Sequence, residues 1–452
     1  MAPPVEMALD KLPAFWDRSV VFVANLLSLF FGNVEQRRVL EGEINWLDSY
    51  DGRLAPVLNL LFRGTGNVLV VDHRPHRQLL DYFTDELGLS LPELVTLPAD
   101  LYRRMESADH LGDARFTAII EELRGYQTPW IDGFVTDAGL SRLAQLIDKQ
   151  TITTPDGSRN GNNKVLLHQF MDAAGFPVFD TLMADEVTAI GDHLAELAAS
   201  GYTQAVVKSA IGASGIGLVK LAVDADPSSV PDYVCFEGPC MVQGWLDSTV
   251  AGVDYFSSPS VQMFVGDDAI TVYDLTEQIL GDESVHEGNV SPPPYLDELP
   301  EVREHLFAQA RVVADWLHGL GYRGTASGDF HVVKRHDAFE VRVCEVNARV
   351  TGATYPAVLA RLFRPDSAWM MRNVRFPTTV DGAWLLQEMH RHGWLFKRDG
   401  AFGILPINFN LDSGGTVRKG QFLALGGTVA GCQLLLGKMQ DDLETVVSYD
   451  RD

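Results

Sequence analysis

The sequence is poor in cysteine and in basic residues. It has 4 cysteines among 452 residues, and no two of them are spaced as C-x-x-C, which argues against a zinc site and a redox pair. Lysine and arginine number 36 against 61 aspartate and glutamate residues, which leaves a formal net charge of −25. This acidic balance argues against nucleic acid and anionic membranes as partners. Isolated thiols are typical of a reducing compartment, so we expect the protein in the cytoplasm.

The sequence also lacks an apolar run long enough to cross a bilayer. The run 20–31 is interrupted by Asn25 and Ser28, and a transmembrane helix needs about 20 apolar residues. Acidic residues precede the run and no small-residue cleavage site follows it, so it does not resemble a signal peptide. We interpret the run as a buried strand and the start of a helix, and we expect no membrane partner.

Strand-like and helix-like segments alternate in the first third of the chain. Segments 67–72 and 130–137 have apolar strand patterns, and a helical pattern follows each of them. This alternation predicts a small, mainly parallel sheet. A polar, turn-rich segment, 153–163, then marks a boundary. The length suggests about three domains, and the predicted units are 1–150, 151–376 and 377–452.

The segment 206–220, VVKSAIGASGIGLVK, has the composition of a phosphate-binding loop. Glycines allow a backbone to approach a ligand closely and to direct N–H groups at it. Lys208 precedes the glycines, unlike the lysine of a P-loop, and a strand pattern rather than a helix follows Gly217. The pattern therefore predicts a β-hairpin flap, and a mobile hairpin without a ligand is the alternative. The candidate ligand-binding residues here are Lys208, Ser209, Gly212, Ser214, Gly215 and Gly217.

A helix is predicted directly after the boundary segment. Asn162 or Asn163 can cap it, and Gly175 can end it after Ala174. Lys164 then lies in the first turn, where the helix dipole disfavours a cation. This placement is explained if Lys164 and the helix start face a bound anion, and a solvated lysine is the alternative. A second helix is predicted over 301–321, with one apolar face formed by Val302, Leu306, Val313 and Leu317.

Segment 328–347 contains two strands that form a predicted hairpin. A three-residue connection would pair Arg335 with Phe339. Continued along the strands, this register places Asp329 opposite Glu345. A connection of two or four residues would shift the pairing by one.

Asp329, Glu345 and Asn347 form a candidate metal site. Two carboxylates that face each other repel unless a cation lies between them. With the amide oxygen of Asn347, two residues further along the same face, they form a hard, all-oxygen set typical of Mg²⁺ ligands. Arg349 lies two residues beyond Asn347 and can contact the same ligand. An ordinary solvated polar face is the alternative.

Taken in order, Lys164, Lys208, the flap and the pattern D…E-x-N-x-R resemble the ATP-grasp superfamily. The resemblance implies an α/β (α+β) fold, in which an ATP-grasp domain is preceded by a small parallel-sheet domain and followed by a small C-terminal domain. It implies that the two lysines and the flap bind ATP, and that the metal-site residues hold two Mg²⁺ ions, with Mn²⁺ as an alternative. Lys208 and Arg349 are the candidate catalytic residues. The adenine hinge is expected at Gln243, where a glutamate is usual, and at Gly244, Trp245 and Leu246.

The whole layout is similar to that of the peptide ligases of the pheganomycin and resorcinomycin type. That group joins an unusual amino acid, often one with a guanidino group, to the amine of an amino acid or peptide in antibiotic biosynthesis. The resemblance implies a small-molecule acid, activated as an acyl phosphate, and an amine or peptide acceptor. Acceptor-side candidates in the acidic segment 273–295 are Glu277, Gln278, His286 and Glu287. The tail is expected either to close over the substrates or to join two copies in a homodimer.

Three other functions stay open. A ligase of primary metabolism would use another acid with an amine or thiol, and a non-catalytic sensor would bind ATP without releasing ADP. A phosphotransferase would release a stable phosphorylated product. The set of lysines, metal-site residues and Arg349 argues against a sensor, because a pure binder has little need for paired metal carboxylates.

Overall fold

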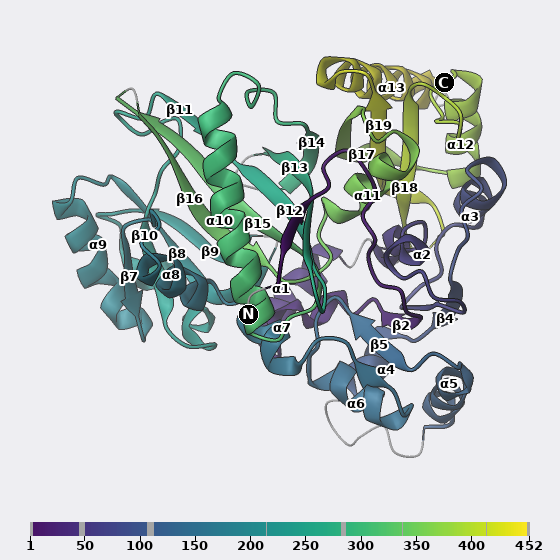
Figure 1. The fold of residues 1–452 in the computed structure, drawn as a ribbon, viewed down its shortest axis with the longest axis horizontal. Helices are drawn as coiled ribbons and strands as arrows, with labels where there is room; N and C mark the ends of the chain where they lie inside the picture. The colour runs from purple at the N-terminus through teal and green to yellow at the C-terminus, as the bar shows by residue number, and fades with distance from the viewer. Residues whose placement is uncertain are drawn as a thin grey trace.

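The computed structural model describes residues 3–44, 50–105, 113–213, 215–281, 286–336, 338–412 and 414–449. Within these residues the chain forms three sheets, which lie in different parts of the molecule (Figure 1). No helix of the described part is both long and apolar enough to span a membrane.

The first sheet is parallel and has five strands, in the order β4-β3-β2-β5-β6. One face of β2 and β3 packs Phe22 and Leu69 into one core, and the other face packs Val21 and Val70 into a second. A parallel sheet with both faces buried is the arrangement that the alternating pattern predicts. The strands are β2 Val20–Val23, β3 Val68–Val71, β4 Glu93–Thr96, β5 Trp130–Gly133 and β6 Gln150–Thr151.

Short helices surround the first sheet. The predicted start of a helix within run 20–31 is a 3₁₀ helix, η1, directly after β2. The helices are η1 Leu26–Phe30, α1 Val34–Ile44, η2 Tyr50–Leu54, α2 Leu58–Leu61, α3 Arg77–Asp81, the π-helix η3 Tyr82–Glu86, α4 Ala99–Arg103, α5 Ala114–Gly125 and α6 Ala138–Leu146.

The second sheet has four antiparallel strands, in the order β7-β10-β8-β9. Strands β8 and β9 form the predicted hairpin flap, and α9 packs Leu194 and Leu197 against Val207 of this sheet. The elements are α7 Pro155–Gly161, α8 Lys164–Ala173, β7 Thr181–Ala184, η5 Val187–Ala189, α9 Ile190–Ala199, β8 Gln204–Ala213, β9 Ile216–Ala222, η6 Pro227–Ser229, η7 Asp232–Cys235 and β10 Cys240–Gly244.

The third sheet has ten strands, with β11-β15-β12-β13-β14-β17-β19-β18 as its main path, while β1 pairs with β13 and β16 with β15. Its strands are β1 Val5–Met7, β11 Tyr255–Ser257, β12 Pro259–Val265, β13 Ile270–Leu280, β14 His286–Ser291, β15 Gly324–Arg335, β16 Ala338–Asn347, β17 Ala368–Val380, β18 Gly403–Leu411 and β19 Val417–Gly426. Its helices are α10 Pro300–Gly319, α11 Thr354–Phe363, α12 Gly382–Arg391 and α13 Val429–Tyr449.

The helix α10 lies across one face of the third sheet (Figure 1). Its predicted apolar face is confirmed, because Val302, Leu306, Val313 and Leu317 are all 0% exposed. At the other end of the sheet, α13 packs on β17 and on the tail strand β19 (Figure 1).

Both predicted domain boundaries fall within strands. Residues 150 and 151 are the two residues of β6, and residues 376 and 377 are consecutive in β17. The tail strands β18 and β19 extend the same sheet that carries β12 to β15. The division into three units therefore stays a prediction, and the tail shares its sheet with the middle of the chain.

The register of the β15–β16 hairpin corrects one expectation. Arg335 pairs with Ala338, so the predicted pairing of Arg335 with Phe339 is wrong by one residue. The connection is tighter than expected, and His336 adopts a positive φ of 51° that permits it. A bulge between Asp329 and Phe330 then shifts the register by one and restores Asp329 opposite Glu345.

Candidate functional site

Lys164 connects the helix α8, the flap and the β15–β16 hairpin, the acidic hairpin, which carries Asp329 and Glu345. Asn163 caps α8 by accepting from the backbone N–H of Leu166, at 3.0 Å, which sets Lys164 in the first turn. The Lys164 Nζ donates to the carbonyl oxygen of Gly212 at 3.0 Å and lies 3.1 Å from Glu345 Oε2. Its side chain is 11% exposed. Lys164 is therefore a nearly buried cation held at a junction of three elements.

Lys208 is a buried cation between the second sheet and the acidic hairpin. Its Nζ donates to Gln243 Oε1 at 2.7 Å and lies 3.7 Å from Cys344 Sγ. Gln243 in turn donates to Thr181 Oγ1 at 2.9 Å. Lys208 is 6% exposed, and no carboxylate among the described residues lies within ion-pair distance of it. A buried ammonium without a counter-ion favours an anionic ligand.

The flap depends on glycine at the positions where the chain turns. A Cβ on Gly212 would lie 2.6 Å from the carbonyl oxygen of Ile216 across the hairpin. Gly215 and Gly217 adopt φ of +79° and +82°, which side chains disfavour. Ser214 lies outside the described residues. The described part of the flap is thus a tight hairpin with close backbone approach.

Gln36 of α1 contacts the flap, and sequence reasoning missed it. Its Nε2 donates to Ser209 Oγ at 2.9 Å and to the carbonyl oxygen of Ile211 at 3.2 Å. Gln36 is 0% exposed, and a Cβ on Gly217 would come within 2.5 Å of its Nε2. The first part of the chain therefore holds the base of the flap through one amide. No local pattern marks this glutamine, because its partners lie 173 and 175 residues away.

Asp329 and Glu345 face each other as predicted. Asp329 Oδ1 accepts from Ser260 Oγ at 2.5 Å, and Asp329 Oδ2 accepts from Asn347 Nδ2 at 2.9 Å. Burial and the nearby Glu345 charge raise the pKa of Asp329 to about 7. Burial opposes ionisation of Glu345 too, but the Lys164 ammonium outweighs it and holds the Glu345 pKa at about 2.

These residues fit a divalent metal ion. The repulsion that raises the Asp329 pKa is relieved by a cation between the carboxylates, and Lys164 already supplies one positive charge to Glu345. The Asn347 amide now directs its nitrogen at both carboxylates, with the Glu345 contact at 3.5 Å. Rotation of the amide would add an oxygen to the set and would give up the hydrogen bond that Arg349 donates to Asn347 Oδ1. Two carboxylates and an amide oxygen suit Mg²⁺.

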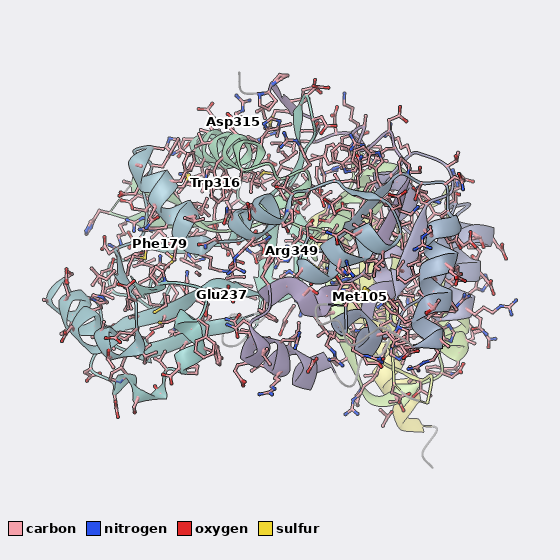
Figure 2. All side chains as sticks on the ribbon, turned by 90° about the horizontal axis from the view of Figure 1, so that it is seen from below. Met105, Phe179, Glu237, Asp315, Trp316 and Arg349 are labelled. Carbon is pink, nitrogen blue, oxygen red and sulfur yellow. The ribbon has the colours of Figure 1, made fainter. Side chains whose placement is uncertain are left out.

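Arg349 lies at the edge of this acidic group. Its Nη1 donates to Asn347 Oδ1, and it lies 3.5 Å from Asn162 Oδ1. Asn162 also accepts from the backbone N–H of Ala348 at 3.1 Å, so it fixes the segment after β16. Figure 2 shows Arg349 near the middle of the molecule, between the part with Phe179 and Glu237 and the part with Met105. Sequence reasoning treated Asn162 only as a candidate helix cap.

The predicted hinge lies at the end of β10, where Gln243 and Gly244 are the last two strand residues and Trp245 and Leu246 follow. A Cβ on Gly244 would lie 2.4 Å from the ring of Tyr202, so glycine is needed there. Trp245 Nε1 donates to Asp247 Oδ2 at 2.5 Å, and Lys220 Nζ lies 4.1 Å from the centre of its ring. Leu246 is 3% exposed and packs in an apolar cluster with Phe179. Of the predicted hinge residues, Gln243 contacts Lys208 directly.

Glu277 and Gln278 both contact Ser258. Glu277 Oε1 accepts from the backbone N–H of Ser258 at 2.6 Å, and Oε2 accepts from the hydroxyl of Tyr295 at 2.8 Å. Gln278 Nε2 donates to Ser258 Oγ at 3.4 Å. Burial raises the Glu277 pKa to about 7. Both carboxylate oxygens of Glu277 are thus bonded within the protein.

His286 and Glu287 begin the neighbouring strand β14. His286 Nε2 is 2.7 Å from Asn289 Oδ1, and burial lowers its pKa. Glu287 Oε2 forms an ion pair with Arg372 Nη2 at 2.8 Å. The structure therefore gives each of the four acceptor-side candidates a protein partner. Their role in substrate binding stays a prediction.

A row of buried polar side chains crosses the third sheet beside the metal-site residues. Strand pairing places Ser260 opposite both Asp329 and Thr276, and it places Gln278 opposite Asn289. Thr351, just after Arg349, donates to Gln262 Oε1 at 3.3 Å. Ser260, Gln262, Thr276 and Asn289 are all at most 2% exposed. These buried polar side chains are bonded to one another, so they form an internal polar network beside the metal-site residues.

Comparisons with known proteins place this geometry in context. No protein-family model matches the chain. Among curated proteins, it is similar to the [butirosin acyl-carrier protein]–L-glutamate ligase of Niallia circulans, with 23% identity over 287 residues. That alignment covers 62% of this chain and 60% of the relative, so the chain spans less than two thirds of that relative's length.

Several solved structures match the chain over nearly its whole length. One is an N5-carboxyaminoimidazole synthase from Aspergillus clavatus in complex with ADP and 5-aminoimidazole ribonucleotide, with 12% identity, a TM-score of 0.53, and coverage of 95% of this chain and 100% of that one. Another is an L-amino acid ligase from Bacillus licheniformis, with 12% identity, a TM-score of 0.52, and coverage of 95% and 98%. These likenesses confirm the predicted α/β fold class.

Proposed function

We propose that this chain, which has the ATP-grasp fold, is an ATP-dependent ligase that joins a carboxylate to an amine. The observation that carries the proposal is the junction at Lys164, whose Nζ contacts both the flap and Glu345. Lys208 and Arg349 add two more cations around the Asp329–Glu345 pair. Three cations and two carboxylates around one point suit a nucleotide triphosphate with metal ions.

The residues of the site would act by position and charge. Lys164 and Lys208 would bind phosphate oxygens, because both are nearly buried cations. Asp329, Glu345 and Asn347 would hold Mg²⁺, which when bound neutralises phosphate charge. The flap, with Gln36 at its base, would exclude water from a reactive acyl phosphate.

The proposed reaction has two steps. A carboxylate oxygen of the acid substrate attacks the γ-phosphorus of ATP, which breaks the bond to the bridging oxygen and yields an acyl phosphate and ADP. The acceptor amine then attacks the acyl carbon, loses a proton and displaces inorganic phosphate. Arg349, which already donates to Asn347, would stabilise the phosphoryl group or the oxyanion in these steps.

We infer that the substrates are amino acids or peptides. The curated relative is named as an L-glutamate ligase, and one structural neighbour as an L-amino acid ligase. A role in antibiotic biosynthesis is proposed from the butirosin relative. We propose that a guanidino acid would bind at Glu277 and Glu287. Such a substrate would have to replace the present side-chain partners of these carboxylates, Tyr295 and Arg372. If either carboxylate binds substrate, its replacement by alanine raises the KM of that substrate more than the KM of ATP.

The test is ADP release with Mg²⁺ and ATP over a panel of amino acids and guanidino acids, with and without peptide acceptors. Mass spectrometry follows the products, and Glu345→Gln is compared with the distant control Glu301→Gln on α10. We expect ADP only when an acid is present, an amide mass when an amine is added, and loss of both in Glu345→Gln alone. ATP that binds without turnover would favour the sensor, and a stable phosphorylated product would favour a phosphotransferase.

A further inference from the structure

A small polar cavity lies between the first sheet and the start of β15. Its volume is about 20 Å³, and residues that line it come from the end of β5, from α7 and from segment 322–325. A cavity of this size holds a single water molecule or ion. Its lining includes Asp132, Thr136, Thr153, Ser158 and Tyr322, and none of these is a candidate metal-site residue.

Asp132 is a buried carboxylate without a matching cation. It is 9% exposed, and among the described residues no Lys, Arg or His lies within ion-pair distance of it. Burial raises its pKa to about 7, although a hydrogen bond from the Gly133 N–H and the charge of Arg18 act in the other direction. Arg18 is itself paired with Asp267. A carboxylate this buried favours either a proton or a bound cation.

The rest of the lining includes hydroxyl oxygens and the cation Arg323. The Tyr322 hydroxyl donates its proton to the carbonyl of Thr325, which leaves its oxygen only as an acceptor. Thr153 Oγ1 donates to the carbonyl of Arg323 at 2.6 Å. The guanidinium of Arg323 donates to the carbonyls of His318 and Tyr322. The charge of Arg323 is therefore engaged by its own neighbours.

We propose that this cavity binds one monovalent cation, with Asp132 as its counter-ion. One carboxylate balances one charge, and hydroxyl and carbonyl oxygens complete the shell, whereas Ca²⁺ and Mg²⁺ sites usually recruit more carboxylates or phosphate. The ion would join the end of β5 to the start of β15 and to Val350, next to Arg349. The proposal does not depend on the proposed ligase activity.

The test is thermal unfolding of the full chain at pH 8, where Asp132 is ionised, without ATP or Mg²⁺. The unfolding temperature is measured in KCl, NaCl, NH₄Cl and choline chloride at constant ionic strength, because choline is too large for the cavity. We expect a higher, saturable unfolding temperature with at least one small cation, rising by roughly 1–2 °C per tenfold concentration above its Kd.

Two variants make the result specific. Asp132→Asn removes the charge at nearly constant volume, so the variant should fold. It should have the same unfolding temperature in the small cation as in choline. Asp315→Asn, a partly buried acid on α10 that does not line the cavity, should keep this difference in unfolding temperature. Equal unfolding temperatures in all four salts would overturn the proposal in favour of a water molecule beside a protonated carboxyl. An ion-specific rise that persists in Asp132→Asn would overturn it as well.

Discussion

At the scale of single residues, the site is a balance of buried charges. Lys164 lies 3.1 Å from Glu345, and Lys208 lies beside Gln243 without a carboxylate partner among the described residues. Glu345 thus stays ionised while its neighbour Asp329 has a pKa of about 7. Lys208 therefore lacks an anionic partner among the described residues, and the two facing carboxylates repel each other. This arrangement suits a ligand that brings phosphate and metal together.

Lys208→Met tests this balance. The thioether fills the space of the lysine stem but cannot bind a phosphate oxygen, and a hydrogen bond to a charged group contributes about 1.5–3 kcal/mol. We expect kcat/KM for ATP to fall roughly 10- to 100-fold in a folded protein. Lys438→Met, at an exposed position of α13, is the control in steady-state ADP assays. An unchanged kcat/KM would remove Lys208 from the nucleotide site.

The raised pKa of Glu277 predicts how the stability of the protein depends on pH. Its folded-state pKa of about 7 lies above the value of about 4.3 for an unfolded glutamate. The folded state then holds a proton that the unfolded state loses, so stability falls as pH rises from about 4.3 to 7 and levels off above it.

Glu277→Gln should remove this dependence. The variant should gain free energy of unfolding relative to the parent protein across that window, as measured by urea unfolding at several pH values. Glu301→Gln, on the exposed side of α10, should show no such trend. A constant difference between Glu277→Gln and the parent would contradict the raised pKa.

At the scale of elements, the flap belongs to two parts of the chain. Its strands are β8 and β9, but its base is bonded to Gln36 of α1. If the flap closes over a nucleotide as proposed, its closure would be coupled to the position of the first part of the molecule.

Gln36→Ala should raise the KM for ATP several-fold and increase ADP release without acceptor, because water enters a less ordered flap. A purely structural role would lower the unfolding temperature without changing the ratio of ADP to amide. Glu35→Ala, the neighbouring surface residue paired with Arg38, is the matched control. Both parameters are read from paired ADP and amide measurements.

At the scale of the whole molecule, the tail completes a sheet. β17 pairs with β14 and β19, and α13 packs Leu436 and Met439 into the largest apolar cluster. The tail strand β19 is therefore joined through β17 to β14.

Deletion of residues 377–452 should prevent folding. It removes β18, β19 and α13, exposes the edge of β17, and uncovers apolar side chains that the helix buries. We expect an insoluble product, or loss of cooperative unfolding by circular dichroism. Deletion of 450–452 alone is the control. A soluble, cooperatively unfolding product of the larger deletion would support an independent C-terminal domain.

The sequence by itself determined the local features of this protein. The alternation of strand and helix patterns specifies the parallel sheet, and the pair Asn162–Asn163 places the start of α8 to within one residue. The spacing within E-x-N-x-R puts Glu345 and Asn347 on one face. These follow from backbone geometry and neighbouring residues, which a linear pattern records.

The tertiary structure alone decided which distant groups meet. The Asp329–Glu345 pair depends on a tight turn and a bulge whose effects on register cancel. The contact of Gln36 with the flap, the partners of Glu277 and the isolation of Asp132 join segments far apart in sequence. Such contacts arise when whole faces pack together, and packing leaves no periodic signal in the residues that make it.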